Sequence, residues 1–320
     1  MTASTSNGAH PPAAPKPLWR SYLAFLGPMI FSNFLQSVSG TVNNIYLGQM
    51  LGVKAMAAVS AFFPVLFFLI AFMIGLGSGA SVLIGQAWGA RELDRVKAIA
   101  GTTLMTGLIA GLVVAVFGGS FADMMLVALG TPADILPGAT AYARIMLIAA
   151  PGVFTFLLVT SMLRGVGDTR TPLLTLLIST AVGLLLTPAL IRGWLGLPMM
   201  GVTSGAWAAV ASYLIALAWT ARHLLRGRHA LAPDAAFRRH LRIDRALLAK
   251  VLRSGLPTGL SMMTIAIAEI SVLFLVNRFG SQATAAYGAV NQIVSYVQFP
   301  AISIAITASI LGAHAIGAGR

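Results

Sequence analysis

The sequence contains no cysteine, and charged residues make up only 9% of its 320 positions. Soluble globular chains carry roughly 25% charged residues, so this composition excludes a soluble enzyme or binding module. Without cysteine there is no disulfide framework, no zinc-thiolate site and no iron-sulfur centre. Any stabilising or redox role of thiols is therefore excluded.

Acidic residues are scarce as well, with 8 Asp and Glu against 21 Lys and Arg. The 5 histidines lie in tails, in loops or at a helix end without metal-ligand spacing. An intramembrane transferase would need His, Asp, Glu or Ser clustered near one membrane interface, and no such cluster occurs. We therefore predict that the chain is not an enzyme and binds no metal or organic cofactor.

Long apolar runs are abundant, since hydrophobic residues make up 58% of the chain. A helix needs about 20 apolar residues to cross the hydrocarbon core. The charge-free stretches predict eight such helices, and hence an all-α polytopic membrane protein. The predicted helices are 25–47, 55–84, 98–121, 145–163, 171–191, 202–221, 255–276 and 285–311.

The formal charge is +13, and the basic residues are distributed unequally between the two sides of the membrane. Such an excess of Lys and Arg marks the cytoplasmic side. With the N-terminus in the cytoplasm, all but four of the 21 basic residues fall on the cytoplasmic side. The four on the other side are Lys54, Arg144, Arg192 and Arg278. We therefore expect a multi-pass protein of the cytoplasmic (inner) membrane that contacts lipid rather than nucleic acid.

The chain repeats itself after 228 positions, which divides it into two units. Gly27-Pro28 aligns with Gly255-Leu256-Pro257, and Ser81-Val82-Leu83 aligns with Ser309-Ile310-Leu311. The offset spans six helices, so both units enter the membrane in the same direction. The predicted organisation is a disordered tail (1–20), a six-helix bundle (21–221), a basic cytoplasmic linker (222–253) and the start of a second bundle (254–320).

An ordered set of motifs resembles the multidrug and toxic compound extrusion family. The set comprises Gly27-Pro28, GQAWGAR at 85–91, LGTP at 129–132, LRGVGDTRTP at 163–172, GVTSGAWA at 201–208 and GLP at 255–257. The resemblance implies twelve helices in two parallel six-helix bundles, of which eight are present here. Either the chain is a fragment or it is a functional short form.

The same resemblance implies a secondary active antiporter that exports organic cations, drugs or other amphipathic compounds in exchange for H⁺ or Na⁺ by alternating access. A lipid-linked saccharide flippase of the same superfold is the alternative. Its cavity would need several cationic residues for a pyrophosphate, and none is seen inside the predicted helices. No obligate protein partner is evident.

Glu269 is the only acidic residue within a predicted span. A carboxylate in hydrocarbon is costly unless it is protonated, paired or hydrated, so Glu269 is the candidate for the coupling ion. The resembling family often has an acidic residue in this helix. In the first bundle, Asn43 and Thr187 stand where its proton-coupled members carry carboxylates, and neither side chain titrates.

Polar residues at helical spacing mark the faces expected to line a cavity between the bundles. The substrate-cavity candidates are Asn33, Ser37, Asn43, Asn44, Tyr287, Asn291, Ser295 and Gln298. Interhelical hydrogen bonding is the alternative role for each.

A cytoplasmic hinge is predicted at Arg164, Gly165, Gly167 and Asp168, where the glycines permit a tight turn. Asp168 is expected to cap the following helix or to pair with Arg164 or Arg170. The glycine run at 75–79 follows no strand and predicts close helix packing rather than phosphate binding.

Overall fold

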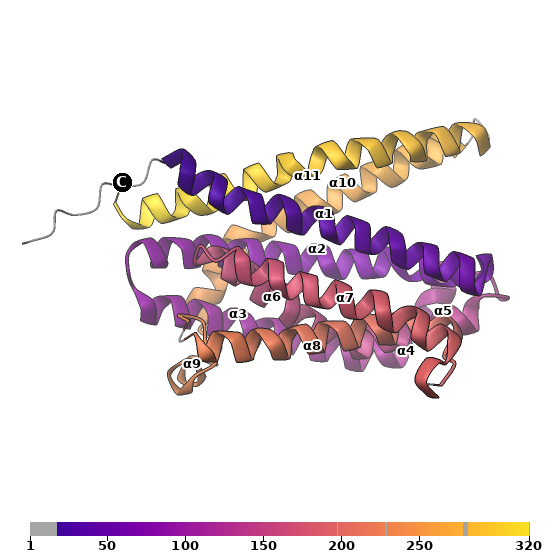
Figure 1. Ribbon diagram of the computed structural model, residues 1–320, viewed down its shortest axis with the longest axis horizontal. Helices are drawn as coiled ribbons and strands as arrows, with labels where there is room; N and C mark the ends of the chain where they lie inside the picture. Colours follow the sequence, from indigo (N-terminus) through magenta and orange to yellow (C-terminus); the bar gives the residue numbers. More distant parts are fainter. Residues whose placement is uncertain (1–17, 197, 228, 278–280, 320) are drawn as a thin grey trace, which may run out of the picture.

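The computed structural model describes residues 18–196, 198–227, 229–277 and 281–319, and the regular elements in these ranges are all helices. Four of them are long: α1 (Leu18–Leu51), α2 (Val53–Gly89), α10 (Arg245–Asn277) and α11 (Ser281–Gly317). Figure 1 shows α10 and α11 as a pair beside α1 and α2, with the remaining helices below them.

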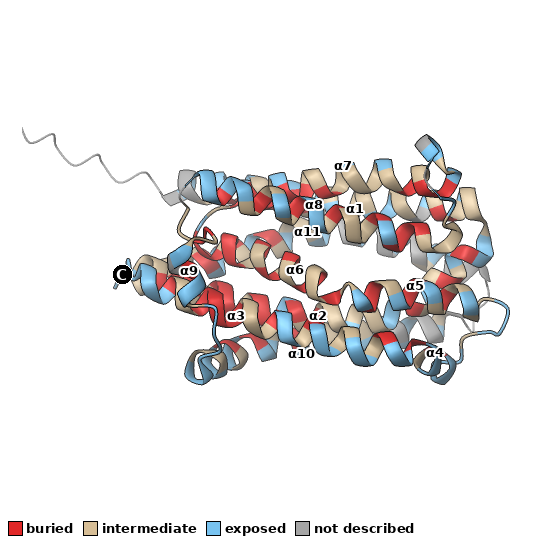
Figure 2. Cartoon of the chain, turned by 90° about the horizontal axis from the view of Figure 1, so that it is seen from below, coloured by how far each residue is buried: buried red, intermediate tan, exposed pale blue. Residues whose placement is uncertain are grey.

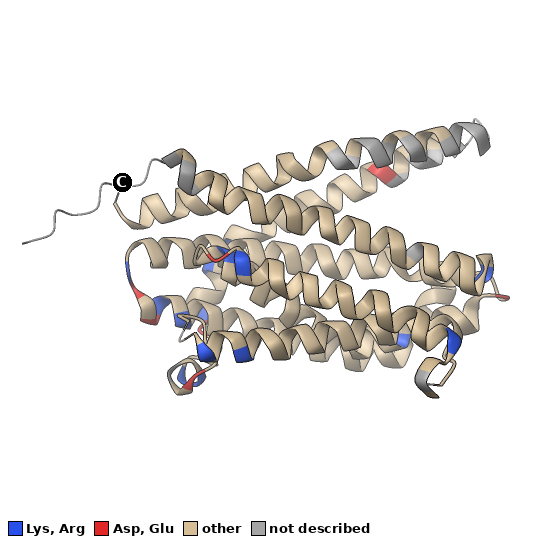
Figure 3. Ribbon diagram, in the orientation of Figure 1, with Lys and Arg blue, Asp and Glu red and all other residues tan. Residues whose placement is uncertain are grey.

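The other helices belong to the first unit, except α9 (Ala235–Arg239), which lies in the linker. They are α3 (Leu93–Val113), a π-helical segment (Val114–Gly118), α4 (Gly119–Ala128), α5 (Leu136–Ile148), α6 (Ala150–Gly165), α7 (Arg170–Arg192), α8 (Ser204–Arg226) and the short α9, with 3₁₀ turns at Trp194–Gly196 and Gly201–Thr203. Figure 3 shows the charged residues gathered mainly at the two ends of the bundle.

The internal repeat is visible in the helix boundaries. The starts of α2 and α11, at 53 and 281, differ by 228, and so do their ends, at 89 and 317. Both helices run in the same direction, because Gly85 of α2 lies against Ala313 of α11 near the end of each helix. The predicted parallel relation of the two units is therefore confirmed for this pair.

Several predicted boundaries are wrong. The span predicted at 145–163 is two helices, α5 and α6, bent by 55° next to Pro151, whose ring cannot continue the α5 hydrogen bonding. The span predicted at 98–121 begins at Leu93 and passes through the π-helical segment. Helix α1 already begins at Leu18, whereas the rest of the predicted tail lies outside the described residues.

The helices extend into both ends of the predicted linker (222–253). Helix α8 continues to Arg226 and α10 begins at Arg245, so only residues 227–244 connect the two units, with α9 inside them. We call the end of the bundle next to these residues the linker end, and the opposite end the far end.

By length and composition, six helical stretches of the described chain can cross a membrane, or seven if the bent pair α5–α6 counts as one span. Helix α1 is not among them, so this measure gives fewer than the eight expected. In the apolar stretches only 17% to 39% of the residues are buried. Figure 2 shows the buried residues facing the interior of the bundle, which leaves the outer apolar faces to lipid.

Candidate functional site

The two units meet along a contact of α10 and α11 with α1 and α2, which we call the seam. At its centre, α2 and α10 cross through glycines. A Cβ atom on Gly75 would lie 2.9 Å from the Gly255 carbonyl oxygen and from the Gly259 Cα. The predicted close packing of the glycine run is therefore confirmed, and only glycine allows this backbone approach.

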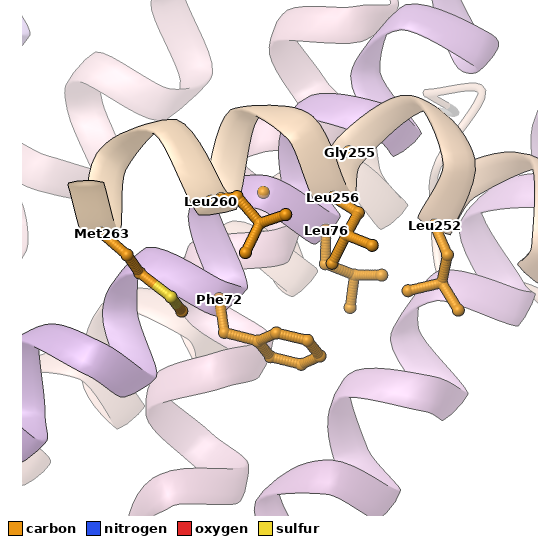
Figure 4. Close-up of a pocket in the computed structure, with 9 residues that line it drawn as sticks. Phe72, Leu76, Leu252, Gly255, Leu256, Leu260 and Met263 are labelled. Atoms are coloured by element: carbon orange, nitrogen blue, oxygen red, sulfur yellow. The ribbon is translucent and has the colours of Figure 1, made fainter. Parts of the chain in front are cut away.

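Large apolar side chains flank this glycine crossing on both helices, as Figure 4 shows. Phe72 and Leu76 come from α2, and Leu256, Leu260 and Met263 come from α10. The space between them is only about 20 Å³, close to the volume needed for one water molecule. The α2 and α10 helices therefore pack against each other with little space between them at this level.

The ends of α2 and α11 close the seam at the linker end. Cβ atoms on Gly89 and Gly317 would overlap the carbonyl oxygens of His314 and Gln86, respectively. His314 Nε2 also donates a hydrogen bond of 2.7 Å to the Gly165 carbonyl at the end of α6. His314, which no sequence motif marks as functional, thus joins the second unit to the predicted hinge.

Helix α1 contacts α11 through polar groups in the half of the molecule next to the linker end. Asn33 Nδ2 donates a hydrogen bond of 2.8 Å to Ser303 Oγ, and Tyr22 donates one of 3.2 Å to the Ile304 carbonyl. Nearby, Phe25, Met29 and Ile310 form a buried apolar cluster. Asn33 therefore has a direct partner in the second unit, so it stands at the seam itself.

Toward the far end, α10 and α11 run away from α1 and α2 (Figure 1). Glu269 lies on α10, ten residues beyond Gly259 and hence about 15 Å farther from the linker end. The Glu269 side chain is exposed on the surface of the helix bundle. The only acidic residue of the predicted spans thus lies beyond the point where the units are locked together.

Asn43 and Thr187 are brought together inside the first unit. Thr187 Oγ1, on α7, donates a hydrogen bond of 3.4 Å to Asn43 Oδ1, on α1. Thr187 is buried and Asn43 is half-buried. The amide and hydroxyl that replace the carboxylates of the resembling family therefore form one neutral polar pair.

The other cavity candidates are dispersed. Ser37 and Tyr287 are half-buried and Gln298 is exposed. The side chains of Asn44, Asn291 and Ser295 lie outside the described residues. Of the eight candidates, Asn33 and Asn43 thus have polar partners among the described residues, and each partner comes from another helix.

The hinge motif lies at the linker end between α6 and α7. Gly167 has φ of +87°, a conformation that favours glycine. Asp168 Oδ1 accepts hydrogen bonds of 3.0 Å from the backbone N–H groups of Arg170 and Thr171. The predicted capping of the next helix is confirmed.

Among the described residues, Asp168 realises this capping alternative, and its ion pair is with a histidine rather than with Arg164 or Arg170. Asp168 Oδ2 instead lies 3.8 Å from Nε2 of His229, in the linker. Burial lowers the pKa of His229, the Asp168 carboxylate raises it by a smaller amount, and His223 lowers it. The hinge thus holds the linker through Asp168 and the second unit through Gly165.

A family model described as MatE matches residues 28–189 and 257–320. The chain is 45% identical over 303 residues to "Probable multidrug resistance protein YoeA" of Bacillus subtilis, covering 95% of this chain and 65% of that protein. It is 26% identical to "Probable multidrug resistance protein YpnP" of the same organism, covering 94% of this chain and 66% of that protein.

A solved structure described as the outward-facing conformation of a multidrug resistance MATE family transporter superposes with a TM-score of 0.84 at 26% identity. The match covers 93% of this chain and 65% of that chain. The chain therefore spans about two thirds of the length of the relatives that it matches.

Proposed function

Because the chain belongs to the MatE family of multidrug and toxic compound extrusion transporters, we propose that the protein is a secondary active antiporter. It exports organic cations or other amphipathic compounds in exchange for H⁺ or Na⁺. The protein lies in the cytoplasmic membrane, with its N-terminus on the cytoplasmic side. The observation that supports this proposal best is the seam, which is locked by glycines at the linker end while its helices diverge toward the far end.

In this proposal, Glu269 is the group that carries the coupling ion. A carboxylate in a membrane-spanning helix can bind a cation, and a cationic substrate can compete with that cation for the same site. The neutral Asn43–Thr187 pair can accept or donate hydrogen bonds but cannot release a proton. Coupling in the described residues therefore falls to Glu269, and the polar residues of the seam contribute to substrate contact.

The flippase alternative gains no support from the seam. The Lys and Arg residues of α1, α2 and α10 lie near the starts of these helices, and α11 has no Lys or Arg. A pyrophosphate-linked lipid would need cationic groups deeper in the membrane.

The test replaces Glu269 by Gln, which preserves size and hydrogen bonding but cannot ionise. Cells lacking their own drug pumps, expressing wild-type protein, are expected to accumulate less ethidium than empty cells. Glu269→Gln is expected to abolish this difference at equal expression. Glu92→Gln is the control, because Glu92 is exposed outside the spans and pairs with Arg95 at 2.9 Å. Undiminished export by Glu269→Gln excludes Glu269 as the coupling site.

A further inference from the structure

The first unit contains an apolar cavity that is separate from the seam. It has a volume of about 380 Å³ and lies between α3, α6 and α8. Leu104 comes from α3, Val159 and Met162 from α6, and Leu217 and Ala221 from α8. This volume lies within the range of small-molecule sites.

The polar atoms that border the cavity are already satisfied by the protein. Thr155 donates its hydroxyl to the Pro151 carbonyl at 2.7 Å. Thr220 donates to the Ala216 carbonyl at 2.8 Å and lies 2.7 Å from the hydroxyl of Thr175. Since the hydroxyls are engaged inside their own helices and with each other, the cavity favours a hydrocarbon occupant.

The apolar surface continues along the same two helices. A second cavity of about 130 Å³ is lined by Gly152 and Val153 of α6 and by Val210 and Leu214 of α8. From Val210 to Leu224, α8 rises by about 21 Å. Half of the hydrocarbon core is about 15 Å thick, so the two cavities together are long enough for the acyl chain of a lipid in one leaflet to lie along the helices.

The linker closes the end of the larger cavity with apolar side chains and places basic ones beside it. Leu231, Pro233 and Phe237 line the cavity. The exposed Arg238 and Arg239 directly follow Phe237 on α9. The whole stretch 222–253 holds nine basic residues and two acidic ones. The protein surface beside this end of the cavity is therefore positively charged and attracts an anionic headgroup.

We propose that the α3–α6–α8 cavity binds an acyl chain of an anionic phospholipid, whose headgroup lies against α9. The site is independent of the transport seam and of the coupling ion. It would let a bilayer lipid hold the linker against the first unit, because the same ligand contacts α9, α3 and α8.

The first experiment measures the phospholipid that remains bound to the purified full-length protein, by native mass spectrometry. Ala218→Phe fills the cavity from α8, since Ala218 lines it. Ile215→Phe is the control, because Ile215 is exposed on the same helix and does not line the cavity. Retention of phosphatidylglycerol is expected to fall roughly tenfold in Ala218→Phe, the loss expected when about two methylene groups lose their contact.

The second experiment tests the headgroup without changing the cavity. Arg238→Gln with Arg239→Gln is expected to remove the preference of the wild-type protein for phosphatidylglycerol over phosphatidylcholine in micelles. Equal retention of phospholipid by wild type and Ala218→Phe overturns the proposal. Displacement of the bound lipid by ethidium at transport concentrations also overturns it, because the cavity would then be a substrate site.

Discussion

At the scale of single residues, glycines decide how closely the two units approach. A Cβ atom on Gly79 would overlap the Val251 carbonyl oxygen and lie 2.7 Å from the Gly255 amide nitrogen. We expect Gly79→Ala to lower stability by about 1–3 kcal/mol, the usual cost of overpacking, because two helix backbones must move apart. Thermal unfolding of the detergent-solubilised protein measures this change.

Gly40→Ala is the matched control for this substitution. Gly40 also lies inside a long helix, but a Cβ atom there would meet nothing within 4 Å. Alanine is favoured over glycine in a helix by up to about 1 kcal/mol, so this variant is expected to unfold at the same temperature or a higher one. Equal destabilisation of both variants would mean that the α2–α10 crossing does not depend on its glycines.

At the scale of elements, the contact between the hinge and the linker is expected to depend on pH. The folded protein holds the pKa of His229 below its ordinary value of about 6.5, chiefly by burial. As pH falls below about 6.5, the unfolded chain binds a proton more readily than the folded one, so stability is lost. The thermal midpoint is therefore expected to fall between pH 7.5 and pH 5.5.

Two substitutions separate His229 from other titrating groups in this measurement. His229→Asn is expected to show a smaller fall in the midpoint, because the titrating ring is gone. Asp168→Asn keeps a group that can cap α7 but removes the attraction to protonated His229, so a larger fall is expected. An unchanged pH dependence in His229→Asn would exclude His229 as a source of this instability.

A structural feature could be predicted from the sequence where residues close together in the chain determine it. The repeat, the glycine packing and the cap at Asp168 follow from short motifs and were predicted. The Asn33–Ser303 and His314–Gly165 hydrogen bonds join residues 270 and 149 positions apart. Which residues meet in these bonds depends on how far each helix is shifted along its neighbour. No local sequence pattern specifies that shift.

At the scale of the whole molecule, the alternating access that we propose requires the seam to open at the linker end in another state. Asn33 and Ser303 lie in contact across this seam, and the sequence contains no native cysteine. We expect the pair Asn33→Cys and Ser303→Cys to react with a short thiol crosslinker, and we expect ethidium export to stop because the units are then tied together. Cleavage of the crosslinker by a reductant should restore export.

The control crosslink lies within one unit. Thr175 and Thr220 have hydroxyls 2.7 Å apart on α7 and α8, which both belong to the first unit. Units that move as rigid bodies tolerate this crosslink, so Thr175→Cys with Thr220→Cys should export equally well before and after reaction. Loss of export here would place the motion inside the first unit, and continued export with the Asn33–Ser303 crosslink would mean that this seam does not open during transport.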